Sequence, residues 1–139
     1  MEKELIEKLM ETAIEQIKYS YAPYSGFKVG ASLLTEEGKI YTGCNIENAS
    51  YTPTNCAERT AFFKAVSEGE RNFKAIAIVG GKDGLLTSYT APCGVCRQVM
   101  MEFCNPDEFK IILGISKEDY KIYTLKELLP LGFGSSNVL

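Results

Sequence analysis

Two short cysteine clusters constrain this chain more than any other feature of its sequence. The first is Asn55-Cys56-Ala57-Glu58-Arg59 and the second is Pro92-Cys93-Gly94-Val95-Cys96. A closed structural zinc site uses four protein ligands, whereas a catalytic site uses three and leaves one tetrahedral position for water. The pattern therefore predicts a catalytic metal centre held by Cys56, Cys93 and Cys96. Glu58 lies two residues after the first of these, close enough to reach a metal-bound water without binding the metal.

The same cysteines could also serve a redox function or a structural zinc site instead of a catalytic metal centre. A lone Cys-x-x-Cys also fits a thioredoxin-like redox pair or half of a zinc ribbon. The third cysteine beside Glu58 weakens the redox interpretation, and a ribbon would need a second Cys-x-x-Cys, which the sequence lacks. A non-catalytic zinc or thiol-redox protein is nevertheless an alternative from a different functional class. Cys44 and Cys104 belong to neither cluster, and we interpret them as small buried residues.

The length and composition are those of an ordinary globular protein. The chain has 139 residues, with 45% hydrophobic and 24% charged side chains, which predicts a single domain over residues 1–139 with its own core. No apolar run approaches the roughly 20 residues that a membrane span needs. The first residues lack the hydrophobic stretch of a signal peptide. We therefore expect no membrane association and a cytoplasmic location.

The charge and the absence of histidine narrow the chemistry. The net charge is 15 − 18 = −3, without a block of basic residues, whereas polynucleotide binding normally leaves a cluster of Lys and Arg. We therefore expect a small-molecule substrate and no nucleic acid. Five cysteines in a cytoplasmic chain indicate metal binding or catalysis rather than disulfides. Because the chain contains no histidine, proton transfer near neutral pH needs another group, and Glu58 is the leading candidate.

The order of predicted elements is helix, hairpin, helix, strand, helix, strand, strand, helix. Apolar spacing predicts helices over residues 3–19, 56–69, 92–104 and 125–129. Strands are expected over residues 28–35 and 39–45 as a hairpin, then over 74–79, 109–115 and 121–124, and residues 85–89 are a candidate for one more short extended piece. Strands that alternate with helices favour an α/β layered domain with helices on both faces of the sheet.

The segment 45–55 is a polar loop, and a loop of this length in a compact domain is more often functional than idle. Asn45 and Glu47 are two residues apart in an extended stretch, so their side chains can point the same way. An amide beside a carboxylate suits hydrogen bonding to sugar hydroxyls, although a solvated loop is the alternative. Phe27, at the start of the first strand, is either a core aromatic or a wall of a ligand pocket.

Both cysteine clusters fall at predicted helix N-termini, where unpaired N–H groups and the helix dipole favour thiolate. Asn55 is a candidate N-cap, which would make Glu58 part of a capping box. Three thiolates around zinc need a compensating positive charge. Arg59 and Arg97, each next to a motif residue, are the candidate donors.

With these residues in view, the chain resembles the small cytidine deaminases of the homotetrameric, three-cysteine type. The resemblance runs nearly end to end through the segments 24–31, 43–51, 56–61, 92–98 and 128–130. It implies a three-layer α/β/α sandwich on a five-stranded mixed sheet, with one Zn²⁺ per chain. It also implies hydrolytic deamination of cytidine and 2′-deoxycytidine in pyrimidine salvage, by a homotetramer with active sites at the subunit interfaces.

The resemblance assigns roles to individual residues. The implied zinc ligands are Cys56, Cys93 and Cys96, with Glu58 as the proton shuttle. The implied substrate-binding positions are Phe27, Asn45, Glu47, Ala49, Tyr51 and Ala57, of which Ala49 and Tyr51 reach a neighbouring subunit's site. Arg59 matches the donor to the thiolates. Phe133 matches an aromatic residue supplied by another subunit, although the spacing within residues 130–134 differs from the family pattern.

Related deaminases are the nearest rival interpretations. A deaminase of another aminopyrimidine nucleoside, such as blasticidin S, shares the Cys-Ala-Glu and Pro-Cys-Gly-x-Cys elements. The stretch Asn45–Ala49 favours cytidine, because it resembles the ribose-reading segment of cytidine deaminases. A deaminase acting on a polynucleotide is less favoured by the charge balance.

Overall fold

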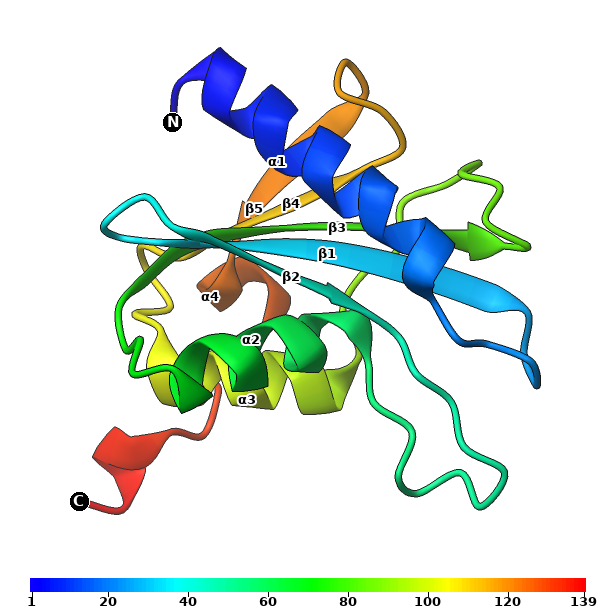
Figure 1. Cartoon of the computed structure of the whole chain (residues 1–139). Coiled ribbons are helices and arrows are strands. Elements are labelled where there is room, and N and C mark those ends of the chain that lie inside the picture. The colour runs from blue at the N-terminus through cyan, green and yellow to red at the C-terminus, as the bar shows by residue number, and fades with distance from the viewer.

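The computed structural model describes residues 1–139, which form a five-stranded sheet in the order β2-β1-β3-β4-β5 (Figure 1). Strands β3 and β4 are parallel, and the other neighbouring pairs are antiparallel. The expected five-stranded mixed sheet is therefore confirmed. The strand bounds are β1 Phe27–Thr35, β2 Ile40–Cys44, β3 Phe73–Lys82, β4 Lys110–Gly114 and β5 Tyr120–Thr124.

Helices cover both faces of the sheet, which confirms the three-layer arrangement (Figure 1). Helix α1 lies on one face, while α2 and α3 lie side by side on the other. The α-helices are α1 Lys3–Gln16, α2 Ala57–Ser67, α3 Gly94–Phe103 and the short α4 Leu125–Leu128, and 3₁₀ turns cover Ile17–Tyr19 and Ser135–Asn137. None of these helices is long and apolar enough to cross a membrane.

The sheet separates two hydrophobic cores, and strand β3 shows how the sequence builds both. Its alternating residues Ala75, Ala77 and Val79 pack toward α1, whereas Ile76 and Ile78 pack toward α2 and α3. This is the two-residue period of a strand buried on both faces. The larger core, on the α2 and α3 side, supports the helices that carry the cysteine clusters.

Two glycines let helices approach the sheet closely. A Cβ atom on Gly43 would lie 2.2 Å from the carbonyl oxygen of Ala57 in α2. A Cβ atom on Gly30 would lie 2.1 Å from the carbonyl oxygen of Ala13 in α1. Both distances are far below van der Waals contact, so each glycine sets the position of one helix. Gly43 thereby sets the depth of the helix that follows Cys56.

The candidate extended piece over residues 85–89 does not form a strand. The chain instead turns at Asp83 and Gly84, which both have positive φ, and continues as a loop to Cys93. The sheet offers no place for an extra strand there, because β3 is already paired with β1 on one side and with β4 on the other. The helix expected over residues 3–19 is confirmed, with its last turn in 3₁₀ form.

Candidate metal centre and substrate pocket

The cysteines of the two motifs stand at the N-termini of α2 and α3, as the sequence predicted. Cys56 and Cys93 are the N-cap residues of these helices, and both have extended backbone conformations. Neither thiol makes a capping hydrogen bond to the backbone of its own helix, so capping does not occupy either sulfur. Cys96 lies in the first turn of α3 and is buried.

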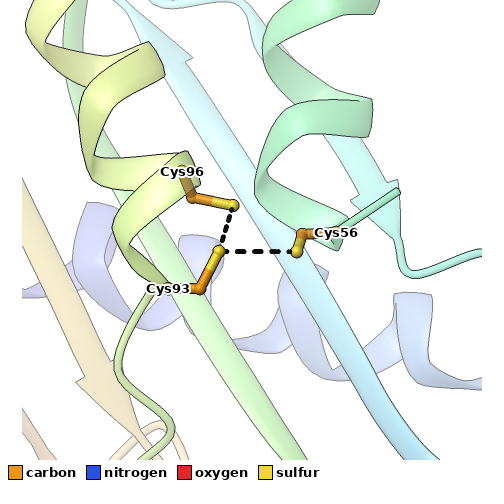
Figure 2. Close-up of side chains that lie close together, drawn as sticks. All are labelled: Cys56, Cys93 and Cys96. Carbon is orange, nitrogen blue, oxygen red and sulfur yellow. Dashed lines mark hydrogen bonds between the residues drawn. The ribbon is translucent and has the colours of Figure 1, made fainter. Parts of the chain in front are cut away.

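The three sulfur atoms point toward one another (Figure 2). The Sγ of Cys93 is 3.7 Å from that of Cys56 and 3.5 Å from that of Cys96, and all three lie within 4.8 Å of one another. Thiolates at about 2.3 Å from one tetrahedral zinc ion would be about 3.8 Å apart. The donor chemistry and spacing therefore fit a single zinc ion. Cys44 and Cys104 are buried outside this group, which confirms their interpretation as small buried residues.

A positive charge stands beside the sulfurs. The Nη2 of Arg59 donates to the Sγ of Cys56 at 3.1 Å, and its Nε–H is buried without an acceptor. The Cys96 thiol and the Arg59 guanidinium together lower the pKa of the Cys56 thiol to about 5. A thiolate at neutral pH is the form that binds metal. Arg59 thus offsets the negative charge that three thiolates would bring to the site.

Glu58 lies in the first turn of α2 with its side chain in the protein interior, and it is only 4% exposed. Burial raises the pKa of the Glu58 carboxyl to about 7. A carboxyl with this pKa exchanges protons in both directions near neutral pH, as a general acid and base must. A cation at the neighbouring sulfurs would favour the ionised form and lower this pKa.

A pocket of about 300 Å³ joins the cysteines to the residues expected to bind substrate. Cys56, Cys93 and Glu58 line it, so a molecule in the pocket would contact the sulfurs and the carboxyl together. The expected substrate-binding residues that also line it are Phe27, Asn45, Glu47 and Ala57. Phe27 is therefore a pocket wall rather than a core residue.

Comparison with known proteins identifies the family. Residues 3–112 match the family model described as the cytidine and deoxycytidylate deaminase zinc-binding region. The cytidine deaminase of Sporosarcina psychrophila is 49% identical over 133 residues, which is 96% of this chain and 94% of that protein. This chain belongs to the cytidine and deoxycytidylate deaminase family. Its cofactor is accordingly zinc, and the cluster of Cys56, Cys93 and Cys96 can hold one ion.

Solved deaminase structures share the fold. The crystal structure of cytidine deaminase from Burkholderia pseudomallei superposes with a TM-score of 0.82 at 46% identity, covering 91% of this chain and 97% of that one. The cytidine deaminase of Mycobacterium tuberculosis gives a TM-score of 0.77 at 37% identity, covering 91% and 95%. These similarities extend over nearly the whole chain, so the deaminase fold is not confined to the zinc-binding region.

The deaminase pocket holds the two predicted sugar-binding side chains in fixed orientations. The Oδ1 of Asn45 accepts hydrogen bonds from the Ser20 hydroxyl and from the Val29 N–H, and its Nδ2 donates to the Phe27 carbonyl at 2.7 Å. One N–H of the Asn45 amide is left for a ligand. The Oε1 of Glu47 accepts from the N–H groups of Tyr24 and Ser25, each at 3.0 Å. Asn45 thus offers a donor and Glu47 offers acceptors.

Three expected residues lie outside this pocket. Ala49 and Tyr51 are exposed on the loop that follows β2, and Tyr51 is 72% exposed with a positive φ of 63°. Phe133 is 62% exposed in the C-terminal tail, which is attached to α3 through a hydrogen bond from Gln98 to the Phe133 carbonyl. The structure brings none of the three to the cysteines of its own chain.

Two local expectations need correction. Helix α2 begins at Ala57 with Cys56 as its N-cap, so Asn55 is not the cap and Glu58 is not part of a capping box. The Asn55 amide donates instead to the hydroxyl of Thr60. Arg97 makes no hydrogen bond to sulfur: it donates to the carbonyl groups of Pro92 and Leu128, at 2.7 and 2.5 Å. It therefore connects the start of α3 with the end of α4.

Sequence reasoning missed part of the pocket wall. The residues that line the pocket without having been predicted are Ser25, Val29, Thr54, Asn55, Thr90 and Ala91. Thr90 and Ala91 directly precede the Pro-Cys-Gly-x-Cys motif, so their closeness to the ligands was the available signal. Ser25 had a weaker signal, its place in the turn before Phe27.

Proposed function

We propose that this chain catalyses the hydrolytic deamination of cytidine and 2′-deoxycytidine to uridine and 2′-deoxyuridine, with release of ammonia, in pyrimidine salvage. The proposal treats residues 1–139 as one deaminase domain. The observation that carries it is the pocket in which the buried Glu58 and the three-cysteine cluster meet Asn45 and Glu47. Similarity to the cytidine deaminases of Sporosarcina psychrophila and Halalkalibacterium halodurans, at 49% and 48% identity, supports cytidine as substrate.

The residues of this chain divide the chemical work. Cys56, Cys93 and Cys96 hold zinc, which when bound acts as a Lewis acid and makes water nucleophilic at neutral pH. The Glu58 carboxylate accepts a proton from the attacking water and delivers it to N3 of cytosine. It then takes the proton of the new C4 hydroxyl and passes it to the amino group, so the C4–N bond breaks, ammonia leaves and the C4 carbonyl of uridine forms. Its burial keeps bulk water from competing for those protons. Arg59 holds Cys56 as thiolate throughout.

The pocket favours a nucleoside over a nucleotide. No Lys or Arg is among the residues that line it, whereas two carboxyl groups are, Glu47 and Glu58. A 5′-phosphate would place about two negative charges near these carboxyl groups, with no cation in the pocket lining to pair with them. Lys82, whose charge helps to lower the pKa of Glu47, already donates its Nζ to the Ser25 carbonyl. Cytidine 5′-monophosphate is therefore expected to be a poor substrate.

We also propose a homotetramer in which neighbouring subunits complete each pocket. The exposed Ala49, Tyr51 and Phe133 support this, because side chains that do not reach their own pocket are available to another chain. Light scattering should then give four times the chain mass of 15.4 kDa. A monomer with full activity would contradict the proposal. The cytoplasmic location expected from the sequence stays a prediction.

Parallel assays of the zinc-loaded wild type and its Glu58→Gln variant test the proposed function. We expect wild-type turnover of cytidine and 2′-deoxycytidine and little with cytidine 5′-monophosphate. Because proton transfer contributes about 10²- to 10⁴-fold, Glu58→Gln should lose at least that much turnover while keeping its zinc. Near-normal turnover in the zinc-replete variant would refute the role of Glu58. A wild type that deaminates blasticidin S but not cytidine would replace the proposed substrate.

A further inference from the structure

Ser25 lies between two side chains that the proposed function places around the substrate. Its hydroxyl donates to the Oε2 of Glu47 and accepts from the N–H of Phe27 at 3.0 Å. Ser25 also lines the pocket, together with both partners. One hydroxyl group thus connects the carboxylate expected to bind the sugar with the backbone of the residue whose ring is expected to contact the base.

The two oxygens of Glu47 are held in different ways. Oε1 accepts two backbone N–H groups, from Tyr24 and Ser25, each at 3.0 Å. Oε2 accepts only the Ser25 hydroxyl among the residues of the chain. The terminal torsion of a glutamate is broad, so the backbone contacts fix one oxygen and leave the plane of the carboxylate to Ser25.

The backbone at Ser25 is held without its hydroxyl. The Nζ of Lys82 donates to the Ser25 carbonyl at 2.6 Å, and the Asp83 N–H donates to the Gly26 carbonyl at 2.7 Å. The Gly26 N–H closes the turn on the Ala22 carbonyl at 2.9 Å. Removing the hydroxyl should therefore leave the turn in place and remove only its hydrogen bonds with the Glu47 carboxylate and the Phe27 N–H.

The charge state of Glu47 agrees with this geometry. Hydrogen bonds from the Ser25 hydroxyl and backbone lower the pKa of the Glu47 carboxyl below its ordinary value. An ionised carboxylate is an acceptor only, with about two lone-pair sites on each oxygen. With one site on Oε2 taken by Ser25, the free sites of that oxygen have a set direction.

We propose that Ser25 is a positioning residue for the sugar subsite, because its hydroxyl orients the Glu47 carboxylate to accept a hydrogen bond from a hydroxyl group of the nucleoside sugar. This inference rests on the proposed function, since it needs a nucleoside in the pocket. Ser25 does not act on the reacting atoms. Its loss therefore weakens substrate binding and leaves proton transfer by Glu58 intact.

Steady-state kinetics of the zinc-loaded enzyme test this, with Ser25→Ala compared with wild type and with Ser25→Thr, which keeps the hydroxyl. For cytidine we expect Ser25→Ala to raise KM about tenfold, equivalent to one hydrogen bond to a charged group, with kcat and zinc content near wild type. Ser25→Thr should return KM for cytidine most of the way to the wild-type value. For 2′,3′-dideoxycytidine, which lacks the ring hydroxyls, Ser25→Ala should cost little.

Ser116→Ala is the matched control. The Ser116 hydroxyl accepts hydrogen bonds from the N–H groups of Glu118 and Asp119 in the turn between β4 and β5, and none of these three residues lines the pocket. Ser116→Ala should leave kcat and KM unchanged for both substrates. If Ser25→Ala raised KM equally for cytidine and 2′,3′-dideoxycytidine, Ser25 would have a general structural role and the inference would be overturned. An unchanged KM for cytidine in Ser25→Ala would also overturn it. A wild type inactive on cytidine would instead overturn the proposed function, and the inference with it.

Discussion

Replacing Gly43 by alanine should displace the helix that carries Glu58. The added Cβ would lie 2.2 Å from the Ala57 carbonyl oxygen and 2.7 Å from the Ala61 nitrogen, both in the backbone of α2. Ordinary contact begins at 3.4 Å, so the carbonyl must retreat by about 1.2 Å, the difference between 3.4 and 2.2. Overpacking of this kind costs about 1–3 kcal/mol of stability. A misplacement of about 1 Å at a reacting group costs about 10²-fold in rate.

Gly30→Ala provides the control for this displacement. Its Cβ would meet the Ala13 carbonyl oxygen in α1 at 2.1 Å, so the clash with helix backbone is equally severe. Helix α1 carries none of the proposed site residues, and it lies on the opposite face of the sheet (Figure 1). Both variants should therefore melt at a lower temperature than the wild type, but only Gly43→Ala should lose activity.

The assay is cytidine turnover per bound zinc, measured below the melting temperature of each variant. We expect kcat/KM to fall about 10²-fold in Gly43→Ala, and to stay near wild type in Gly30→Ala. Equal kcat/KM in the two variants, at comparable losses of stability, is the result that this prediction excludes. It would show that the depth of α2 does not set the position of Glu58.

Three further predictions concern charge and assembly. The Cys96 thiol and the Arg59 guanidinium together lower the pKa of Cys56 to about 5, and Arg59→Gln removes the second of these groups. As pH falls, a chelator should therefore strip zinc from the variant at a higher pH than from wild type. The pKa of Glu47 is lowered, so its titration should leave the inhibition constant of uridine unchanged from neutral pH to the ordinary carboxyl range. The constant should rise only as pH falls through the native pKa of Glu47; a rise near neutral pH that Glu47→Gln abolishes would contradict this. Phe133→Ala should lower cytidine turnover at unchanged zinc content, measured by metal analysis, and full activity would remove Phe133 from the neighbouring site.

The metal centre was accessible from sequence because its determinants are local. Cys93 and Cys96 are one helical turn apart, and Cys56 precedes a clear helical pattern. A cysteine just before such a pattern is placed at the helix N-terminus, where N–H groups and the dipole favour its thiolate. The three-thiolate cluster then follows once two such helices lie side by side on one face of the sheet (Figure 1).

Features that depend on tertiary contacts were not accessible in this way. Local pattern alone allowed Glu58 to be a capping residue; its burial depends on how closely α2 approaches Gly43 of β2. Arg97 follows Cys96 directly, yet its guanidinium turns to Leu128, 31 residues away. The candidate extended piece at residues 85–89 formed no strand because β3 had no free edge, which only the strand order reveals.

Deamination of cytidine should depend on the zinc that Cys56, Cys93 and Cys96 hold. The most direct test adds zinc stepwise to metal-free protein and follows the loss of cytidine absorbance as uridine forms, with metal analysis at each step. Turnover should rise in proportion to bound zinc and level off at about one ion per chain. Zinc-replete protein without turnover of cytidine would contradict it.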